Sequence, residues 1–150
     1  MAKVLGVDFG DRRTGVAISD ETRVMAFPRE TLECPLVEQA AAAVVRLAEA
    51  EHVGEIVVGY PLNMNGTAGP RAVKTDRFLA ELARRTSIPL KKWDERLSTK
   101  IAESVMTETG TRRGKRREVV DQLAAQIILQ GYLDANASPD EDGDPDGDFS

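Results

Sequence analysis

Hydrophobic and polar residues alternate at short range in the first part of the chain. Apolar residues concentrate in three segments of strand length, at 3–9, 14–19 and 24–31, which are separated by turns rich in Gly, Asp and Arg. Turns this short connect neighbouring strands that run in opposite directions. The pattern therefore predicts three antiparallel strands at the start of the fold.

From Pro35 onward the pattern changes to helical spacing and then alternates between the two periods. Proline suits the first turn of a helix, so a helix of about four turns is predicted to begin there. An apolar run at 55–59 predicts a central strand, residues 60–70 have the composition of a loop, and a second helix ends near residue 87. The residues predicted to face the core are Leu36, Ala40, Val44, Leu47 and Ala48 in the first helix and Val73, Phe78, Leu79 and Leu82 in the second.

The last third of the chain predicts a short strand and two helices. The strand lies at 90–93, a helix capped by Ser98 or Thr99 follows, and a basic loop at 110–117 precedes a final helix at 118–133. The inward positions of the final helix are predicted to be Val120, Leu123, Ala124, Ile127 and Ile128. Three antiparallel strands followed by alternating strands and helices predict an α/β fold, a mixed five-stranded sheet flanked by helices.

The composition fits one folded domain. The chain has 150 residues, of which 41% are hydrophobic and 30% charged, which excludes a disordered chain and an integral membrane protein. Its apolar runs are much shorter than the ~18 residues that a transmembrane helix needs. Cys34 is the single cysteine, which excludes an intramolecular disulfide and a cysteine-based metal site. The first residues lack the pattern of a signal peptide, so we expect a cytoplasmic protein with no membrane partner.

The net charge of −5 is distributed unevenly along the chain. Residues 134–150 contain seven acids and no base, which leaves 18 acids and 20 bases in residues 1–133. We therefore expect a mildly basic domain at 1–133 and an acidic, disordered tail at 134–150. Because the distribution of charge matters more than its sum, the composition is compatible with a nucleic-acid partner.

Acidic residues occur where predicted strands end and where the final helix begins. Asp8 ends the first strand, Asp94 and Glu95 follow the strand at 90–93, and Asp121 lies early in the final helix. If these elements are neighbours, three carboxylates meet at one edge of the sheet, where they repel one another unless cations or protons are shared. Oxygen ligands without His or Cys favour Mg²⁺ or Mn²⁺. Two such ions could activate a water molecule and stabilise the leaving oxygen of a phosphodiester.

A basic run lies directly before Asp121. Its side chains could hold the phosphate backbone of a nucleic acid close to the metal ions. The residues are Arg112, Arg113, Lys115, Arg116 and Arg117.

Four segments, in order, resemble the motifs of the YqgF/RuvX family. They are residues 6–20 (GVDFGDRRTGVAISD), 58–66 (VGYPLNMNG), 94–99 (DERLST) and 120–125 (VDQLAA). The resemblance spans about residues 3–133, and four ordered motifs are far more specific than any one of them.

The resemblance implies an RNase H-like fold and a cytoplasmic bacterial nuclease. The roles proposed for the family are maturation of pre-16S ribosomal RNA and resolution of Holliday junctions. Carried over by position, Asp8, Glu95 and Asp121 would be the catalytic, metal-binding acids. The motif residues Arg13, Asn63 and Arg96 would contact nucleic acid.

The chain departs from the RuvC resolvases at one position. Those proteins place an acid at the end of the fourth strand, where this chain has Gly59, Tyr60 and Pro61. Glu95, at the end of the next strand, would have to take over its role. Adjacent strand residues point to opposite faces, so only one of Asp94 and Glu95 should face the site, and the family pattern favours Glu95.

Each candidate residue also has a structural interpretation. Asp8 could bond to the backbone of the turn that follows it, and Glu95 could pair with Arg96. Asp121 favours the positive end of a helix whatever its role, and the basic run could be a solvated segment.

Two other classes of function compete with a nuclease. Residues 8–14 resemble the first phosphate loop of the actin/hexokinase type of phosphotransferase, but such proteins need a second domain. A non-catalytic ribosome- or transcription-associated binding module could keep the same fold, although retention of three acids weighs against it. Symmetric cleavage of a junction would require a homodimer, whereas trimming of one RNA strand suits a monomer.

Overall fold

The fold is built on a five-stranded sheet with the strand order β3-β2-β1-β4-β5. The computed structural model describes residues 2–62, 65–95 and 113–136. The strands are β1 (Val4–Asp8), β2 (Arg13–Ser19), β3 (Ala26–Glu33), β4 (Glu55–Tyr60) and β5 (Leu90–Asp94). Strands β1, β2 and β3 pair antiparallel, whereas β4 pairs parallel with both β1 and β5. This confirms the predicted mixed sheet and its element order as far as β5.

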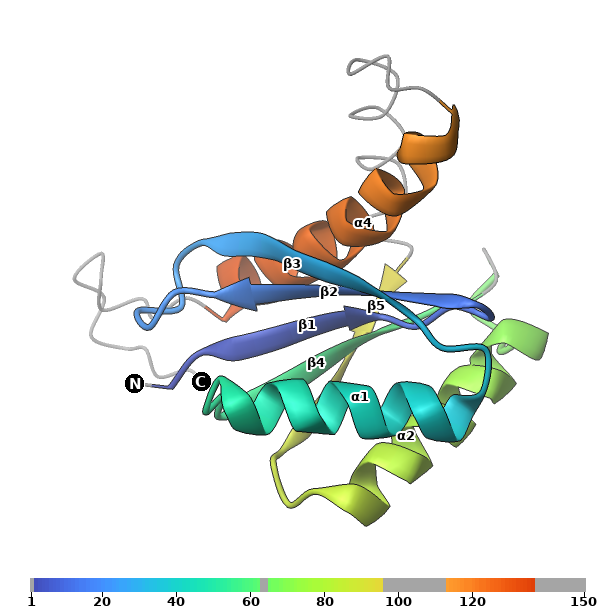
Figure 1. The fold of residues 1–150 in the computed structure, drawn as a ribbon, viewed down its shortest axis with the longest axis horizontal. Helices are drawn as coiled ribbons and strands as arrows, with labels where there is room; N and C mark the ends of the chain where they lie inside the picture. The colour runs from blue at the N-terminus through green and yellow to red at the C-terminus, as the bar shows by residue number, and fades with distance from the viewer. Residues whose placement is uncertain (1, 63–64, 96–112, 137–150) are drawn as a thin grey trace.

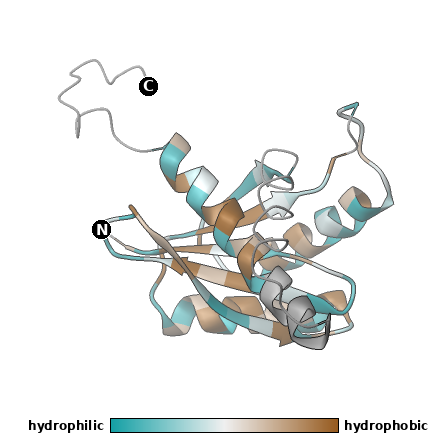
Figure 2. Ribbon diagram, turned by 90° about the horizontal axis from the view of Figure 1, so that it is seen from above, coloured by the Kyte–Doolittle hydropathy of each residue, from teal (hydrophilic) through white to brown (hydrophobic). Residues whose placement is uncertain are grey.

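Helices cover both faces of the sheet. Helices α1 (Val37–Ala50) and α2 (Pro70–Arg85) lie on one face, and α4 (Arg113–Ala135) crosses the other (Figure 1). Figure 2 shows that hydrophobic residues are frequent on the strands, while the helices mix hydrophobic and hydrophilic positions. The residues between the sheet and α1 and α2 form one apolar cluster, and those beneath α4 form a second. None of the helices in the described ranges is long and apolar enough to cross a membrane.

Two predicted core residues are exposed instead. Leu36 is 56% exposed because it precedes α1 with an extended backbone (φ −107°, ψ 141°), so it does not follow the helical phase. Val73 is also 56% exposed, since it is about 100° around α2 from the buried Ala72. The residues that α1 and α2 bury are Ala40, Ala41, Val44, Val45, Ala48, Ala72, Thr75, Phe78 and Leu82.

Helix α4 begins earlier than predicted. Residues 113–117 were expected in a basic loop, but α4 starts at Arg113 because Arg and Lys are good helix formers. The helix also continues to Ala135, so it includes Asp134 from the predicted tail. The predicted helix after Ser98 or Thr99 and residues 137–150 of the tail lie outside the described residues.

The packing phase of α4 is set by a close approach to β1. A Cβ atom at Gly6 would lie 2.7 Å from the Cβ of Leu129 and 3.2 Å from the carbonyl oxygen of Ala125, so the helix fits only over a glycine. The fully or almost fully buried residues of α4 are Ala125, Ile128, Leu129 and Leu133. Of the predicted inward residues, Ile128 is buried, whereas Leu123, Ala124 and Ile127 are half-buried at the sides of the contact.

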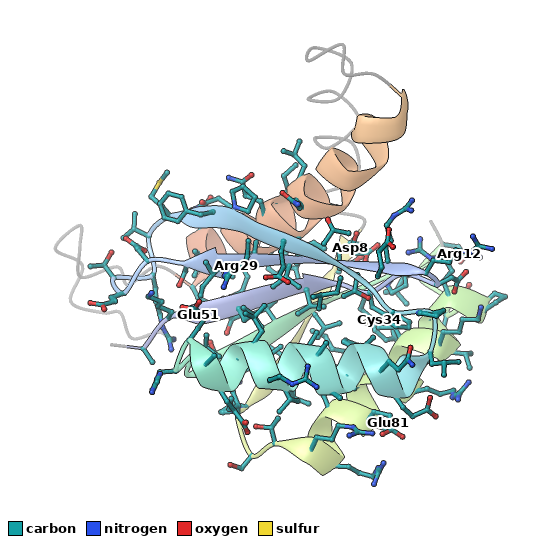
Figure 3. All side chains as sticks on the ribbon, in the orientation of Figure 1. Asp8, Arg12, Arg29, Cys34, Glu51 and Glu81 are labelled. Carbon is teal, nitrogen blue, oxygen red and sulfur yellow. The ribbon has the colours of Figure 1, made fainter. Side chains whose placement is uncertain are left out.

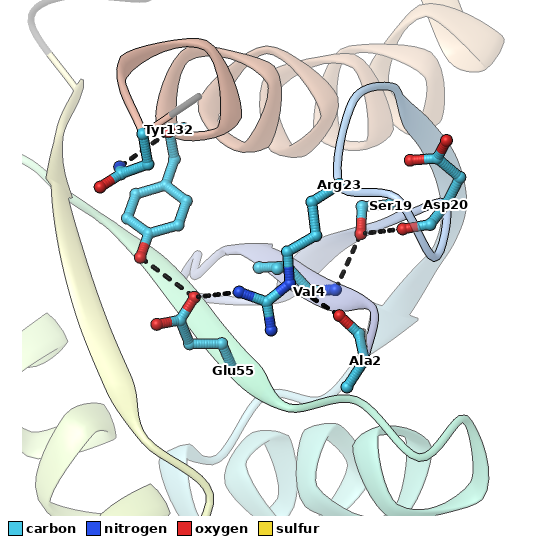
Figure 4. Close-up of polar contacts among 8 residues, drawn as sticks. Ala2, Val4, Ser19, Asp20, Arg23, Glu55 and Tyr132 are labelled. Carbon is cyan, nitrogen blue, oxygen red and sulfur yellow. Dashed lines mark hydrogen bonds and ion pairs between the residues drawn. The ribbon is translucent and has the colours of Figure 1, made fainter. Parts of the chain in front are cut away.

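Polar contacts fasten α4 to the amino ends of the strands (Figure 4). The Tyr132 hydroxyl donates to Oε1 of Glu55 at 3.0 Å, and the Arg23 guanidinium lies 3.5 Å from the same oxygen. Arg23 also donates from Nε to the carbonyl oxygen of Ala2 at 2.7 Å. Burial, followed by the bond to Glu55, raises the pKa of Tyr132 to about 12. These contacts join α4, β4 and the turn before β3. They fix α4 to the end of the sheet at which β1 and β4 begin, called here the amino edge; the opposite end is the carboxyl edge.

Candidate active site

Asp8 stands at the carboxyl end of the central strand β1, on the face that α4 covers. Gly6 faces α4, and side chains two residues apart on a strand point to the same side. Asp8 is half-buried, and its backbone lies opposite that of Gly15 in the antiparallel pairing of β1 with β2. Figure 3 shows it between Arg29 and Arg12 along the sheet. Asp8 is therefore presented at an edge, next to solvent.

Glu95 reaches the same face from strand β5. Trp93 packs against the cluster beneath α4, with its ring edge-on to Tyr132 at 6.3 Å between centroids. Glu95 follows two residues later, directly after the last strand residue, Asp94. Its side chain lies against Gly59 of β4, beside Ile128 of α4. Asp94 alternates with Trp93 and so belongs to the opposite face of the sheet.

Gly59 provides the space in which the Glu95 carboxylate lies. A Cβ atom at position 59 would be 2.8 Å from Oε2 and 2.9 Å from Cγ of Glu95, and 2.5 Å from Cδ1 of Ile128. The Oε2 atom is buried there. A side chain at the end of β4 would therefore occupy the place that Glu95 takes. This chain lacks the acid that the RuvC resolvases have at the end of the fourth strand, and the Glu95 carboxylate of the neighbouring strand lies over that position.

The strand register brings Asp8 and Glu95 together. Val7 pairs with Val58 in the parallel ladder between β1 and β4, so the next step along both strands sets Asp8 beside Gly59. Neighbouring strands lie about 4.8 Å apart. Because the Glu95 carboxylate lies over Gly59, the two acids occupy adjacent places on one face at one edge.

Position 121 lies on the part of α4 that runs toward this edge. Tyr132 contacts Glu55 at the start of β4 and Ile128 contacts Gly59 near its end, so α4 runs against the direction of the strand. Four residues, a rise of about 6 Å, separate position 121 from Ala125, which lies over Gly6. The backbone therefore carries Asp121 toward the Asp8 end of the sheet, and its side chain lies outside the described part of the chain.

The described donors suit a hard divalent cation. Asp8 and Glu95 offer only carboxylate oxygens, and the buried Oε2 is held in a recess that exists because Gly59 lacks a side chain. Such oxygen ligands favour Mg²⁺ or Mn²⁺. Among the side chains that the structure describes there is no group of three or more His, Cys, Asp or Glu close enough to hold a metal. The predicted third acid, Asp121, has its side chain outside the described part of the chain and stays a prediction.

Arg13 is the predicted nucleic-acid contact that the structure describes in full. It begins β2 and is four residues from Ala17, which belongs to the cluster beneath α4; residues an even number apart share a face, so Arg13 lies on the face of Asp8 and Glu95. An open pocket of about 380 Å³ beside it is lined by Arg12, Arg13, Glu33 and Pro35. The sequence offered no signal for Glu33, because the pairing of β2 with β3 brings it opposite Arg13.

The other predicted nucleic-acid contacts cannot be placed as side chains. Asn63, Arg96 and Arg112 lie outside the described residues. The backbone of the remaining basic positions lies in the first turns of α4, and their side chains are outside the described part; they are Arg113, Lys115, Arg116 and Arg117. These residues stay predictions.

Comparison with known proteins gives a consistent set of relatives. Residues 2–135 match the family described as "RuvX: Holliday junction resolvase". A protein of Symbiobacterium thermophilum named "Putative pre-16S rRNA nuclease" is 45% identical over 136 residues, covering 91% of this chain and 94% of its own. A protein of the same name from Myxococcus xanthus is 41% identical over 144 residues, covering 96% and 95%.

Solved structures share the fold at low sequence identity. Thermus thermophilus RuvC in complex with a Holliday junction has a TM-score of 0.58 at 16% identity, covering 90% of this chain and 95% of its own. The fowlpox virus resolvase bound to junction DNA has a TM-score of 0.56 at 11% identity, covering 90% and 99%. These similarities confirm the RNase H-like architecture that the sequence motifs implied.

Proposed function

Since the chain belongs to the RuvX family, and is therefore a hydrolase that acts on nucleic acids, we propose that it is a metal-dependent endonuclease of structured RNA. The curated relatives, at 41% and 45% identity over nearly the whole chain, are named for pre-16S ribosomal RNA. The proposed activity is cleavage of phosphodiester bonds during maturation of that RNA. We place it in the cytoplasm, where ribosomal RNA precursors are processed.

The observation that carries the proposal is the paired arrangement of Asp8 and Glu95. Strands β1 and β5 lie on either side of β4, and the residues at their ends, Asp8 and Glu95, share one face of the sheet. Because Gly59 has no side chain, the Glu95 side chain can lie over the end of β4. Carboxylates this close favour a shared cation over mutual repulsion.

In this proposal the chain's own residues divide the work. Asp8, Glu95 and Asp121 would hold two Mg²⁺ or Mn²⁺ ions. Bound ions of this kind lower the pKa of a water molecule and stabilise the leaving oxygen of a phosphodiester. Arg13, on the same face, would bind a substrate phosphate and orient the backbone toward the carboxylates. The basic first turns of α4 would hold the phosphates on the Asp121 side.

The family description supports a second substrate, a four-way DNA junction. Symmetric cleavage of a junction needs two active sites related by a two-fold axis, so this substrate requires a homodimer. Trimming of one RNA strand needs a single site. The oligomeric state therefore discriminates between the two substrates.

The test is a cleavage assay with Mg²⁺ or Mn²⁺ on a pre-16S RNA fragment and on a synthetic four-way junction. We expect Asp8→Asn and Glu95→Gln each to lose more than about 100-fold in rate, because loss of an outer-shell partner alone costs 10–100-fold. EDTA should abolish cleavage by the wild type. The matched control is Asp94→Asn, which removes the same charge one residue away on the opposite face and should retain activity.

Each outcome of this assay has a definite meaning. Cleavage of the RNA by a monomer supports ribosomal RNA processing, and paired symmetric nicks in the junction by a dimer support resolution instead. Binding of nucleic acid without cleavage under any metal would contradict the endonuclease and favour a non-catalytic binding module. Equal losses in Asp94→Asn and Glu95→Gln would contradict the assignment of Glu95.

A further inference from the structure

Helix α2 carries a row of basic residues that the proposed active site does not use. Five bases and two acids lie on its 16 residues, in a chain whose net charge is −5. The row, defined here as the α2 row, follows steps of three or four residues, which are neighbours on a helix surface. Its basic members are Arg71, Lys74, Arg77 and Arg84, and the acid Glu81 stands between the last two.

The row is a feature of α2 and is absent from the helix beside it. Helix α1, on the same face of the sheet, has one base, Arg46, and two acids. The buried stripe of α2 contains Thr75 and Phe78, so the basic positions lie around the exposed part of the helix. Figure 3 shows Glu81 at the periphery of the molecule, away from the sheet. A run of positive charge on one exposed helix is typical of a surface that contacts a polyanion.

The structure neutralises only part of the row. Lys74 pairs with Asp11 at 3.0 Å, and Glu81 accepts from Arg84 at 2.8 Å and lies 3.3 Å from Arg85. Arg71 and Arg77 are exposed and form no ion pair with any residue that the structure describes. These two guanidinium groups are therefore available to an external anion without breaking an internal contact.

The row begins at the end of the sheet where the proposed active site lies, on the opposite face. Asp11, the partner of Lys74, is three residues after Asp8, so at most about 11 Å of extended chain separates them. On the other flank of α2, Asp76 accepts a hydrogen bond from the Tyr60 hydroxyl at 2.9 Å, and Tyr60 ends β4. These contacts fix the first half of α2 to the turn after β1 and to the end of β4, which hold Asp8 and Gly59.

The geometry suits a duplex better than a single strand. From Arg71 to Arg84 a helix rises about 20 Å, which corresponds to about six base pairs at 3.4 Å each. Proteins that bind single strands combine a basic surface with exposed aromatic rings on which bases stack. Helix α2 has one aromatic residue, Phe78, which is fully buried and stacked on Phe9 at 4.5 Å between ring centroids. The α2 row can therefore contact the phosphates of a nucleic acid, but it offers no aromatic ring on which bases could stack.

We propose that the α2 row binds the phosphate backbone of a duplex arm adjoining the cleavage site, over about six base pairs. The inference rests on the proposed nuclease function and specifies its substrate as nucleic acid with a double-stranded arm. Arg71 and Arg77 are the principal contacts, and Lys74 and Arg84 contribute through their remaining exposed surface.

The test measures binding in an Asp8→Asn background, so that substrate stays intact. Arg71→Gln/Arg77→Gln is compared with this parent on hairpins whose duplex arms are 4 to 12 base pairs long. Each lost phosphate contact should reduce the magnitude of the slope of log K against log salt by about 0.9, and should weaken binding about eightfold at 0.1 M salt. For the parent, affinity should rise with arm length up to about six base pairs, and for the double variant it should not.

Arg46→Gln supplies the matched control. Arg46 is exposed on α1 and forms no ion pair with a described residue, so its loss removes one charge from a helix on the same face. Its salt slope should equal that of the parent. An unchanged slope in Arg71→Gln/Arg77→Gln, or an equal loss in Arg46→Gln, would overturn the α2 row as a binding surface.

Cleavage by the same variants in the active background separates this inference from the proposed function. The double variant should cleave a short-armed substrate as fast as the wild type does, but should not cleave a long-armed substrate faster than a short-armed one. This result supports both the proposed function and the α2 row. Wild type that neither binds nor cleaves overturns the proposed function and the row together. Poly-glutamate and unlabelled duplex can each be tested as competitors of hairpin binding. If poly-glutamate competes as strongly as duplex, and the double variant abolishes this competition, the row binds an acidic protein partner and the nucleic-acid assignment is overturned.

Discussion

At the scale of single residues, glycines decide what the acidic side chains can do. Asp8 and Glu95 come from strands that do not pair with each other, and a side chain on the strand between them would separate their carboxylates. Gly59 removes that obstacle, since a Cβ atom there would lie 2.8 Å from Oε2 of Glu95. The absence of a side chain at the end of β4 is therefore as much part of the proposed site as the carboxylates.

Gly59→Ala should reduce cleavage more than it reduces stability. The added methyl group displaces the Glu95 carboxylate and the end of Ile128, a flexible side chain that can adjust, so we expect a loss of about 1–3 kcal/mol in the free energy of unfolding. Displacement of the carboxylate should lower the cleavage rate at least tenfold, because a displacement of about 1 Å in an active site can cost 100-fold. Cleavage assays and urea unfolding of one preparation check both numbers.

Gly54→Ala is the control for this prediction. Its Cβ would lie 2.8 Å from the Cβ of Ala2, a clash of similar severity at the opposite edge of the sheet. It should lower stability and leave the cleavage rate of the folded protein unchanged. If Gly59→Ala and Gly54→Ala lose cleavage equally, the special position of Gly59 is refuted.

At the scale of elements, α4 links the proposed site to the rest of the sheet. It lies over Gly6, and Gln126 and Gln130 hydrogen-bond the backbone of Ala26, while Gln130 also donates to Val24. Tyr132 and Glu55 hold its other end. Because the helix is fixed at the amino edge, the backbone of its earlier turns extends toward the Asp8 end of the sheet, where Asp121 stays the predicted third acid.

Gly6→Ala should loosen α4. A Cβ atom 2.7 Å from the Cβ of Leu129 meets the base of a side chain, which cannot move without the helix, so we expect a loss of about 1–3 kcal/mol. Gly131→Ala is the contrast, since its Cβ would lie 3.0 Å from the Trp93 ring and alanine favours a helix, and it should change stability by less than about 1 kcal/mol. Chemical denaturation of both variants measures the difference. A larger loss in Gly131→Ala would show that Gly6 does not set the distance between α4 and β1.

The contact between Tyr132 and Glu55 should make stability depend on alkaline pH. The pKa of Tyr132 is raised from 10.0 to about 12 in the folded protein, first by burial and then by the bond to Glu55. A raised pKa stabilises the fold fully below the unfolded value near 10, and this stabilisation is lost as the pH rises through about 12. The free energy of unfolding should therefore fall across this range.

Tyr132→Phe should remove that part of the alkaline decline. Urea unfolding of the wild type and the variant at pH values from about 9 to about 12 gives the two curves. Tyr60→Phe is the control: the pKa of this half-buried tyrosine is raised first by its bond to Asp76 and only then by burial, so this variant should follow the wild type more closely. Identical curves for Tyr132→Phe and the wild type would contradict the coupling.

At the scale of the whole molecule, the two edges of the sheet have different tasks. The amino edge is closed by Arg23, Glu55 and Tyr132, as Figure 4 shows. The carboxyl edge presents Asp8 and Glu95, with Arg13 on the same face and the α2 row beginning nearby. Rigid contacts at one edge and charged, accessible groups at the other suit a protein that holds a large polyanion.

The acidic residues after α4 should weaken binding of nucleic acid at low salt. Residues 137–150 contain six acids and no base, and their removal would shift the balance of charge toward the basic domain. Truncation after Asn136, which keeps α4 whole, should therefore tighten binding several-fold at low salt and have no effect near 1 M salt, where screening acts within about 3 Å. A filter-binding titration at both salt concentrations checks this.

A charge control completes the tail experiment. A full-length variant with these six acids replaced by Asn and Gln should bind like the truncated chain, since length is restored and charge is not. Equal affinities for the wild type and both variants at low salt would show that the tail does not compete for the basic surface.

Much of the fold and the candidate site follows from local pattern. Short apolar segments, alternating or continuous, predicted all five strands, because such a pattern is a property of each segment by itself. The position of Asp8 at a strand end also follows from local pattern, whereas the choice of Glu95 over Asp94 came from the family resemblance, and the catalytic role of both acids stays a prediction. The helical faces were less accurate: Leu36 and Val73 are exposed, since a helix end or a small neighbour such as Ala72 shifts the buried stripe.

The amino-acid sequence by itself determined the family, the order of the elements and the acids at the strand ends, since these depend on residues close together in the chain. Tertiary structure alone decided that Glu95 lies over Gly59, that α4 packs on Gly6, and that the α2 row begins beside Asp11. These contacts join residues 36, 123 and 63 positions apart. Strand register and helix packing create such proximities, and neither is encoded in a local pattern of hydrophobic and polar positions.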